Sequence, residues 1–132
     1  MNDRRDKLSD WDNDYSRGEH GEHLLSYVMQ TGEIKTDYRW QETGNIFVEV
    51  WCYHKSTNKY EPSGLSVTKA KYWQFVLINK EYTPIVISVP TELLKKIVKN
   101  YGRKVENVNS ENPSVGYLIR LEHIVEEYLK GD

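Results

Sequence analysis

Residues 36–73 read TDYRWQETGNIFVEVWCYHKSTNKYEPSGLSVTKAKYW. Two strand-like runs, at about 33–40 and 45–53, each carry one acid among apolar residues, Asp37 in the first and Glu49 in the second. The Gly-Asn pair between them is typical of a tight turn, so we expect the strands to pair antiparallel with both carboxylates side by side. Because an unpaired acid is costly to bury, this pairing predicts a divalent cation held by oxygen ligands.

The segment upstream, RGEHGEHLLSYVMQ (residues 17–30), is expected to be an amphipathic helix. Its stripe recurs at three- and four-residue spacing and consists of Gly21, Leu24, Leu25 and Val28. Glu22 falls at the edge of this stripe, whereas Glu19 falls nearly opposite its centre. Glu22 is therefore the acid of this helix that we expect near a site.

Together these features resemble the PD-(D/E)xK nuclease superfamily, particularly its small phage-type and Holliday-junction-resolvase-like members. In those families a helix with Gly and, four positions on, Glu precedes one strand with Asp and another with Glu. The corresponding residues here are Gly18, Glu22, Asp37 and Glu49. The resemblance spans roughly residues 17–78 and implies a restriction-endonuclease-like core.

The chain departs from the family pattern at the lysine. The family's lysine normally lies two residues after the Glu on the same strand, where this chain has Trp51. Some members carry it on the next helix, which we expect here at about 65–72, and Lys69 fits that position. Lys71 is its main rival for the role and a candidate contact to nucleic acid.

The resemblance implies a metal-dependent nuclease. Asp37, Glu49 and the backbone carbonyl of Val50 would hold Mg²⁺ or Mn²⁺. Lys69 would orient a water or offset charge on the phosphate, and Glu22 would hold a metal-bound water or a second ion. The substrate would be nucleic acid, DNA in preference to RNA, and a homodimer is left open.

The predicted elements favour an α/β or α+β fold with a mixed central β-sheet flanked by helices. Strands fit YWQFVLIN and TPIVISV, and a helix is expected from Pro90 to Gly102. Within NIFVEVWCY, alternation predicts one face with Ile46, Val48, Val50 and Cys52, and another with Phe47, Glu49, Trp51 and Tyr53. Residues 1–16 are expected to form a flexible tail and 17–132 a single domain.

Composition narrows the functional class. The net charge of −2 argues against a generally basic nucleic-acid-binding surface but leaves room for a local one. The single cysteine, Cys52, is expected to be a small buried residue. Because one cysteine cannot form an internal disulfide, the expected compartment is the reducing cytoplasm, which for a phage protein is that of the host. No apolar run approaches the roughly 18 residues of a membrane span.

Other residues have two readings. Lys95, Lys96 and Lys99 would either contact phosphates or form a solvated helix face. The aromatic residues Trp51, Tyr53, Tyr60 and Trp73 would either stack on unpaired bases or pack in the core and its rim. Asp37 itself would equally serve as a cap or salt bridge at a strand end.

Two alternatives from other functional classes remain. The first is a catalytically inactive nuclease-fold protein that binds nucleic acid or regulates, which Trp51 favours. The second is a small protein-interaction module with an apolar and aromatic surface.

Overall fold

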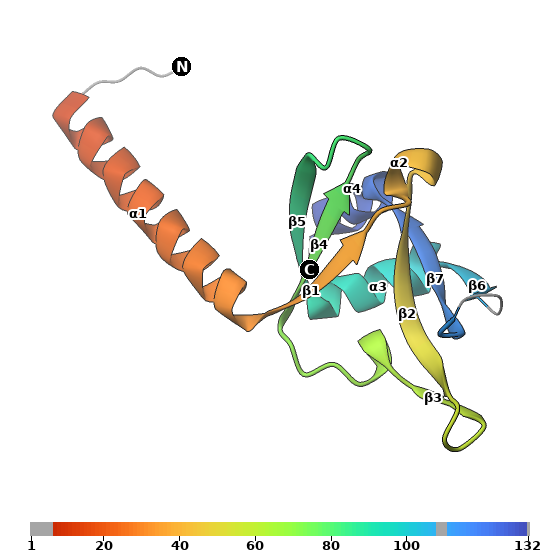
Figure 1. The fold of residues 1–132 in the computed structure, drawn as a ribbon. Coiled ribbons are helices and arrows are strands. Elements are labelled where there is room, and N and C mark those ends of the chain that lie inside the picture. The colour runs from red at the N-terminus through yellow and green to blue at the C-terminus, as the bar shows by residue number, and fades with distance from the viewer. Residues whose placement is uncertain (1–6, 108–110, 132) are drawn as a thin grey trace. The chain divides into compact units, whose positions relative to one another are not determined.

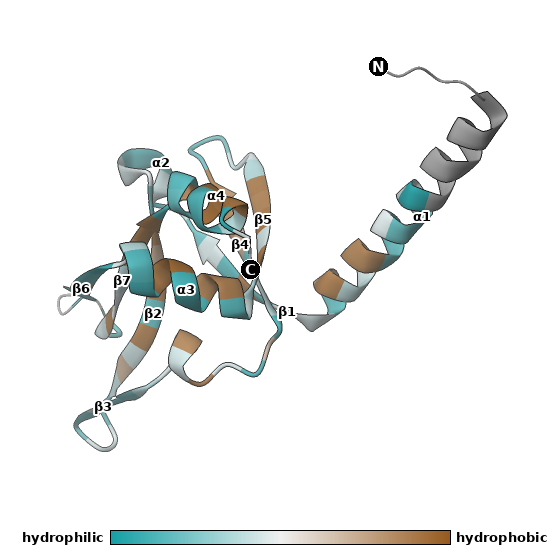
Figure 2. Ribbon diagram, turned by 180° about the vertical axis from the view of Figure 1, so that it is seen from behind, coloured by the Kyte–Doolittle hydropathy of each residue, from teal (hydrophilic) through white to brown (hydrophobic). Residues whose placement is uncertain are grey.

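The computed structural model describes residues 7–107 and 111–131, with side chains from residue 17 onward. The chain divides into two compact units, Met1–Thr31 and Gly32–Asp132. The described part of the first unit is the helix α1, Lys7–Thr31. Figure 2 shows hydrophobic residues along its last turns, and Leu24 and Leu25 are exposed there. The helix is confirmed, but it begins earlier than expected, so the predicted boundary at residues 16–17 falls within it.

The second unit contains the remaining elements, shown in Figure 1. In chain order they are β1 (Gly32–Asp37), α2 (Trp40–Thr43), β2 (Asn45–His54), β3 (Lys59–Pro62), the 3₁₀ turn η1 (Gly64–Ser66), β4 (Tyr72–Ile78), β5 (Pro84–Pro90), α3 (Thr91–Tyr101), β6 (Arg103–Asn107), β7 (Ser114–Arg120) and α4 (Leu121–Leu129).

The strands form two sheets. One has the order β1-β4-β5, with β1 parallel and β5 antiparallel to β4. The other has the order β3-β2-β7-β6 and is antiparallel throughout. The α+β class is therefore confirmed, with a mixed and an antiparallel sheet in place of the expected single central sheet.

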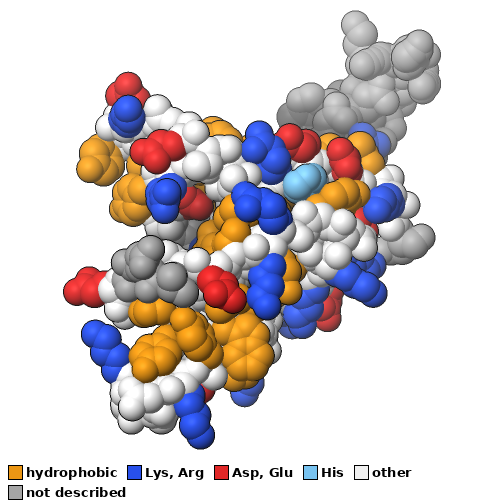
Figure 3. Space-filling model, turned by 90° about the vertical axis from the view of Figure 1, so that its right-hand side faces the viewer, with side chains coloured by type: hydrophobic (Ala, Val, Ile, Leu, Met, Phe, Trp, Pro, Cys, Tyr) orange, Lys and Arg blue, Asp and Glu red, His pale blue; other side chains and the backbone are white. Residues whose placement is uncertain are grey.

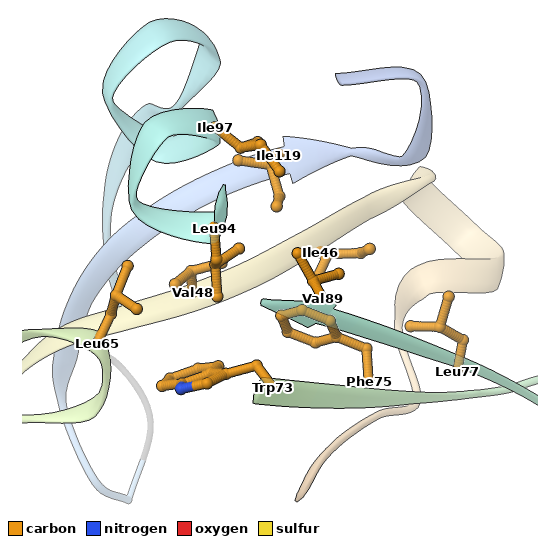
Figure 4. Close-up of a cluster of buried hydrophobic side chains, with 10 residues drawn as sticks. All are labelled: Ile46, Val48, Leu65, Trp73, Phe75, Leu77, Val89, Leu94, Ile97 and Ile119. Atoms are coloured by element: carbon orange, nitrogen blue, oxygen red, sulfur yellow. The ribbon is translucent and has the colours of Figure 1, made fainter. Parts of the chain in front are cut away.

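A hydrophobic core lies where the two sheets and α3 meet (Figure 4). Alternate residues of β4 supply Trp73, Phe75 and Leu77, each at most 1% exposed. The other buried members are Ile46, Val48, Leu65, Val89, Leu94, Ile97 and Ile119. Removing each large apolar side chain from water contributes roughly 1.5–3 kcal/mol, so this cluster is the main source of stability for the unit.

Helix α3 follows the sequence prediction closely. It follows Pro90, ends before Gly102, and buries Leu94 and Ile97 on one side. Its first residue, Thr91, donates from its backbone N–H to the carbonyl of Lys71 (2.8 Å) and from Oγ1 to that of Ala70 (2.6 Å). These bonds connect the start of α3 to the segment that precedes β4.

The predicted hairpin between the first two strands is wrong. β1 and β2 are joined by α2 and belong to different sheets. Gly44 does adopt the left-handed conformation (φ 74°), but it ends α2, where its N–H donates to the carbonyl of Trp40 (2.7 Å). The Gly-Asn pair therefore correctly predicted a positive φ at Gly44. The connection that it forms is the end of a helix and not the predicted hairpin turn.

The predicted alternation along β2 fails beyond Glu49. Glu49 pairs with Gly116 and Trp51 with Val115, so Val50 is an extra residue in the ladder, a β-bulge. The bulge shifts the alternation by one position. Cys52 therefore shares a face with Glu49 and is only half-buried, whereas Trp51 moves to the opposite face.

Candidate functional site

Three charged residues alternate along β1: Glu33, Lys35 and Asp37, which we call the charged stripe. In the parallel ladder they are the partners of Trp73, Phe75 and Leu77, respectively. Partners in a ladder point to the same side of the sheet, so the stripe lies on the face that carries the core. All three side chains are half-buried. Charges in such a place require partners to offset the loss of water.

Glu33 has two partners. Its Oε2 lies 2.9 Å from Lys35 Nζ, and its Oε1 accepts a hydrogen bond of 2.7 Å from Thr68 Oγ1. Burial alone would raise the pKa of Glu33, but the hydrogen bonds from Lys35 and Thr68 and the positive charge of Lys35 outweigh it and hold the pKa below its ordinary value. Lys35 Nζ also lies 5.3 Å from the centroid of the Trp73 ring, within range of a cation–π interaction.

Asp37 ends the stripe and caps the following turn. Its Oδ1 accepts the backbone N–H groups of Arg39 (2.8 Å) and Trp40 (2.9 Å). This is the capping alternative considered for Asp37 in the sequence. Its Oδ2 has no hydrogen-bond or ion-pair partner in the described part of the chain, so half of the carboxylate stays available.

Glu49 and Val50 lie in the other sheet, on β2. The carbonyl of Val50 accepts the N–H of Ser63 (2.9 Å), and Gly64 approaches Glu49 so closely that a Cβ at position 64 would lie 3.1 Å from that of Glu49. Within residues 7–107 and 111–131, no three His, Cys, Asp or Glu side chains are grouped so as to hold a metal ion. The structure does not pair the strands of Asp37 and Glu49.

Lys69 lies in an exposed segment after η1, because the expected helix at 65–72 is only the 3₁₀ turn Gly64–Ser66. Its neighbour Thr68 contacts Glu33, which connects this segment to β1. Lys71 is also exposed. Lys69 therefore lies in a loop, next to the residue that contacts Glu33, and not on the helix that the resemblance implied.

The other predicted site residues are on helix surfaces. Glu22 is exposed on α1, in the first unit. Lys95, Lys96 and Lys99 are exposed on α3, and Lys95 Nζ lies 3.6 Å from Glu92 Oε2. An exposed pair of this kind contributes little to stability and leaves the lysines accessible.

A surface hollow of about 470 Å³ adjoins the end of the charged stripe. Asp37, Arg39 and Glu106 contribute charged groups to its wall, and Phe47 and Leu118 contribute apolar ones. It is large enough for a small polar group such as a phosphate with its sugar. The hollow connects β1 with the outer face of the antiparallel sheet.

Sequence reasoning missed Glu33 and Lys35. A signal was present, because Glu33-Ile34-Lys35 places an acid and a lysine two positions apart in a strand, and therefore on one face.

Comparison of the chain with protein-family models, with curated proteins and with solved structures finds no match. No described helix is both long enough and apolar enough to cross a membrane.

Proposed function

We propose that this protein is a divalent-metal-dependent nuclease whose reacting groups are those of the charged stripe. The observation that carries the proposal is the Glu33–Lys35 pair: two half-buried groups on one face of a strand, 2.9 Å apart, with Glu33 also accepting a hydrogen bond from Thr68. A lysine two residues after an acid on a strand is the spacing that the resemblance to PD-(D/E)xK nucleases implies. Glu33-Ile34-Lys35 has this spacing, which Trp51 interrupts after Glu49.

The stripe has donors suited to a hard cation. Mg²⁺ is commonly held by one or two carboxylates together with water and substrate phosphate. Residues of a strand are about 3.3 Å apart along it, so Glu33 and Asp37, four positions apart, cannot share one ion. The Oδ2 atom of Asp37 would hold Mg²⁺ or Mn²⁺ with water and substrate phosphate. Glu33, which Lys35 and Thr68 engage through both oxygens, would instead fix Lys35 in place. When bound, the ion would polarise a phosphodiester and lower the pKa of a water.

Lys35 has the role of the compact cation in this proposal. Its ammonium group would offset the charge that develops on the phosphate, and the ring of Trp73 and the carboxylate of Glu33 hold it in place. Lys69, next to Thr68, would approach the same phosphate from the exposed loop. That the α+β unit is a restriction-endonuclease-like core, as the resemblance implies, is part of the same proposal.

Binding without cleavage is a second candidate function. Asp37 Oδ1 and the carbonyl of Val50 are both engaged by backbone N–H groups, which weakens the ligand set first expected from the sequence. A protein with these acids in structural roles would still bind nucleic acid through its lysines.

Cleavage of labelled single-stranded and duplex DNA and RNA, with Mg²⁺, with Mn²⁺ and with EDTA, tests the proposal. The parent should cleave at least one substrate only with metal, and Glu33→Gln should lose that activity. Glu92→Gln, which removes the acid of an exposed ion pair on α3, is the matched control. A parent that cleaves nothing with either metal would overturn the nuclease, and only measured binding of the same probes would then support the binding-only function.

A further inference from the structure

The β2–β3 hairpin carries an exposed row of rings. Its ladder pairs Trp51 with Pro62 and Tyr53 with Tyr60. Residues two apart on each strand, and partners across the ladder, share a face, so these four side chains lie on one side of the hairpin. We call them the aromatic ribbon. Figure 1 shows this hairpin extending away from helices α3 and α4.

The rings are accessible and held in place. Trp51 is 42% and Tyr60 41% exposed. The rings of Tyr53 and Tyr60 meet edge to face, with centroids 5.3 Å apart. Tyr53 Oη donates to Asn58 Oδ1 (3.0 Å), and the Tyr53 N–H donates to the carbonyl of Pro113 (2.9 Å). A ligand would therefore meet a Tyr53–Tyr60 pair that is already ordered in the free protein.

The charges around the ribbon are complementary to a polyanion. Lys55 lies in its turn, exposed and without an ion pair to a described residue, whereas Lys59 pairs with His54 in the ladder and therefore lies on the opposite face from the rings. The acid of β3, Glu61, pairs in the ladder with Cys52, on the opposite face from the rings, where its Oε2 lies 3.3 Å from His54 Nε2. Figure 3 shows hydrophobic side chains gathered at this end of the molecule, with Lys and Arg at their border.

We propose that the aromatic ribbon binds single-stranded nucleic acid, with unpaired bases stacking on Trp51 and Tyr60 and a phosphate contacting Lys55. Bases within a duplex already stack on each other and do not offer a free face, whereas unpaired bases do. The surface combines flat rings with the exposed cation of Lys55, which suits bases joined by phosphates better than an apolar peptide. The inference rests on the proposed function and names its substrate class, unpaired strands.

The test is binding of a fluorescein-labelled oligo(dT) of about 20 nucleotides and of a blunt duplex of equal length, measured by anisotropy in EDTA. The parent should bind the single strand more tightly. Trp51→Ala and Tyr60→Ala should each raise its Kd by about fivefold to a hundredfold, because each removes one stacking partner. Trp51→Phe and Tyr60→Phe should retain most of the affinity, and Lys55→Ala should lower the salt dependence.

Tyr128→Ala on α4 is the control, since Tyr128 is 69% exposed outside the ribbon. Thermal melting checks that every variant is folded, and the Phe variants keep the test valid if an Ala variant is not. The proposal is overturned by a parent that binds neither probe, by equal or tighter duplex binding, or by ribbon variants that bind like the parent. EDTA prevents metal-dependent cleavage during the binding assay, so the two proposals can fail separately. If the ribbon binds the single strand but the parent cleaves nothing with metal, only the nuclease proposal fails. If the parent cleaves with metal but the ribbon variants bind like the parent, only the ribbon proposal fails.

Discussion

In β1, Glu33 and Lys35 face the side of the sheet that carries the buried ring of Trp73, whereas in the aromatic ribbon Trp51 and Tyr60 remain in contact with solvent. The charged groups are paired with each other, whereas the rings keep part of their surface open to solvent. Partly buried charges with fixed partners are preorganised to act on developing charge, while exposed rings are suited to a ligand that arrives and leaves. Under the proposed function, the reacting groups and the recognition surface for one substrate would lie in different sheets.

Lys35→Ala should separate the two regions most clearly. Loss of a preorganised donor to developing charge typically lowers the rate by about 10²–10³-fold, so metal-dependent cleavage should fall by that amount. Oligonucleotide binding in EDTA should change little, because the ribbon is untouched. Quantified cleavage time courses provide the measurement.

Lys130→Ala is the matched control, because Lys130 Nζ lies 3.0 Å from Glu127 Oε1 in a similar pair on α4. Equal cleavage by the Lys35 and Lys130 variants would remove Lys35 from the reaction. Lys69→Ala tests the loop lysine in the same cleavage assay, with Lys71→Ala as its control.

A triple variant of Lys95, Lys96 and Lys99 to Ala asks whether recognition extends beyond the ribbon to α3. If all three lysines contact phosphates, the slope of log K against log salt should flatten by about 2, at roughly 0.7 per contact on a single strand. Alanine preserves the helix, so folding should be retained. An unchanged slope in a salt titration would return the three lysines to the solvated face of α3.

Gly44→Ala tests the connection that keeps β1 and β2 in separate sheets. Gly44 has φ 74°, and a Cβ there would lie 2.9 Å from Nη2 of Arg120. We expect a loss of roughly 1–2 kcal/mol in the free energy of unfolding, from the left-handed conformation and the displaced guanidinium. Urea unfolding measures it, with Gly18→Ala, which meets no atom within 4 Å, as the control. Equal midpoints would show that this turn tolerates a side chain.

The fold was predictable where its causes are local. Helix α3 follows from its apolar spacing and from Pro90 and Gly102, and the strand character of β2 and β4 follows from their composition. The partner of β1 was not predictable, because it is β4, beyond two intervening strands. The bulge at Val50 was also hidden, since only the ladder with β7 reveals the extra residue.

The candidate site was predictable only in part. Asp37 was identified as a residue with two readings, and the structure shows the capping one at Oδ1. Glu33 and Lys35 were discernible from their spacing, but the significance of Glu33 depends on Thr68, which lies 35 residues away in the sequence. Contacts at that separation arise from packing, which residue patterns do not encode.

Glu33→Gln should also change how stability depends on pH. The pKa of Glu33 is lowered below its ordinary 4.5 in the folded protein, mainly because Lys35 and Thr68 stabilise the carboxylate against the opposing effect of burial. The ionised group therefore stabilises the fold above the pKa of the unfolded chain, and this contribution is lost as the pH falls through the lowered value. Urea midpoints measured from pH 7 to pH 3 in EDTA should fall more steeply for the parent than for Glu33→Gln. Thr68→Val, which removes one of the two hydrogen bonds, should give an intermediate slope. Parallel curves for all three proteins would show that the Glu33–Lys35 pair contributes no more to folding than an exposed ion pair does, and the contrast between the charged stripe and the solvent-facing ribbon would then lose its energetic basis.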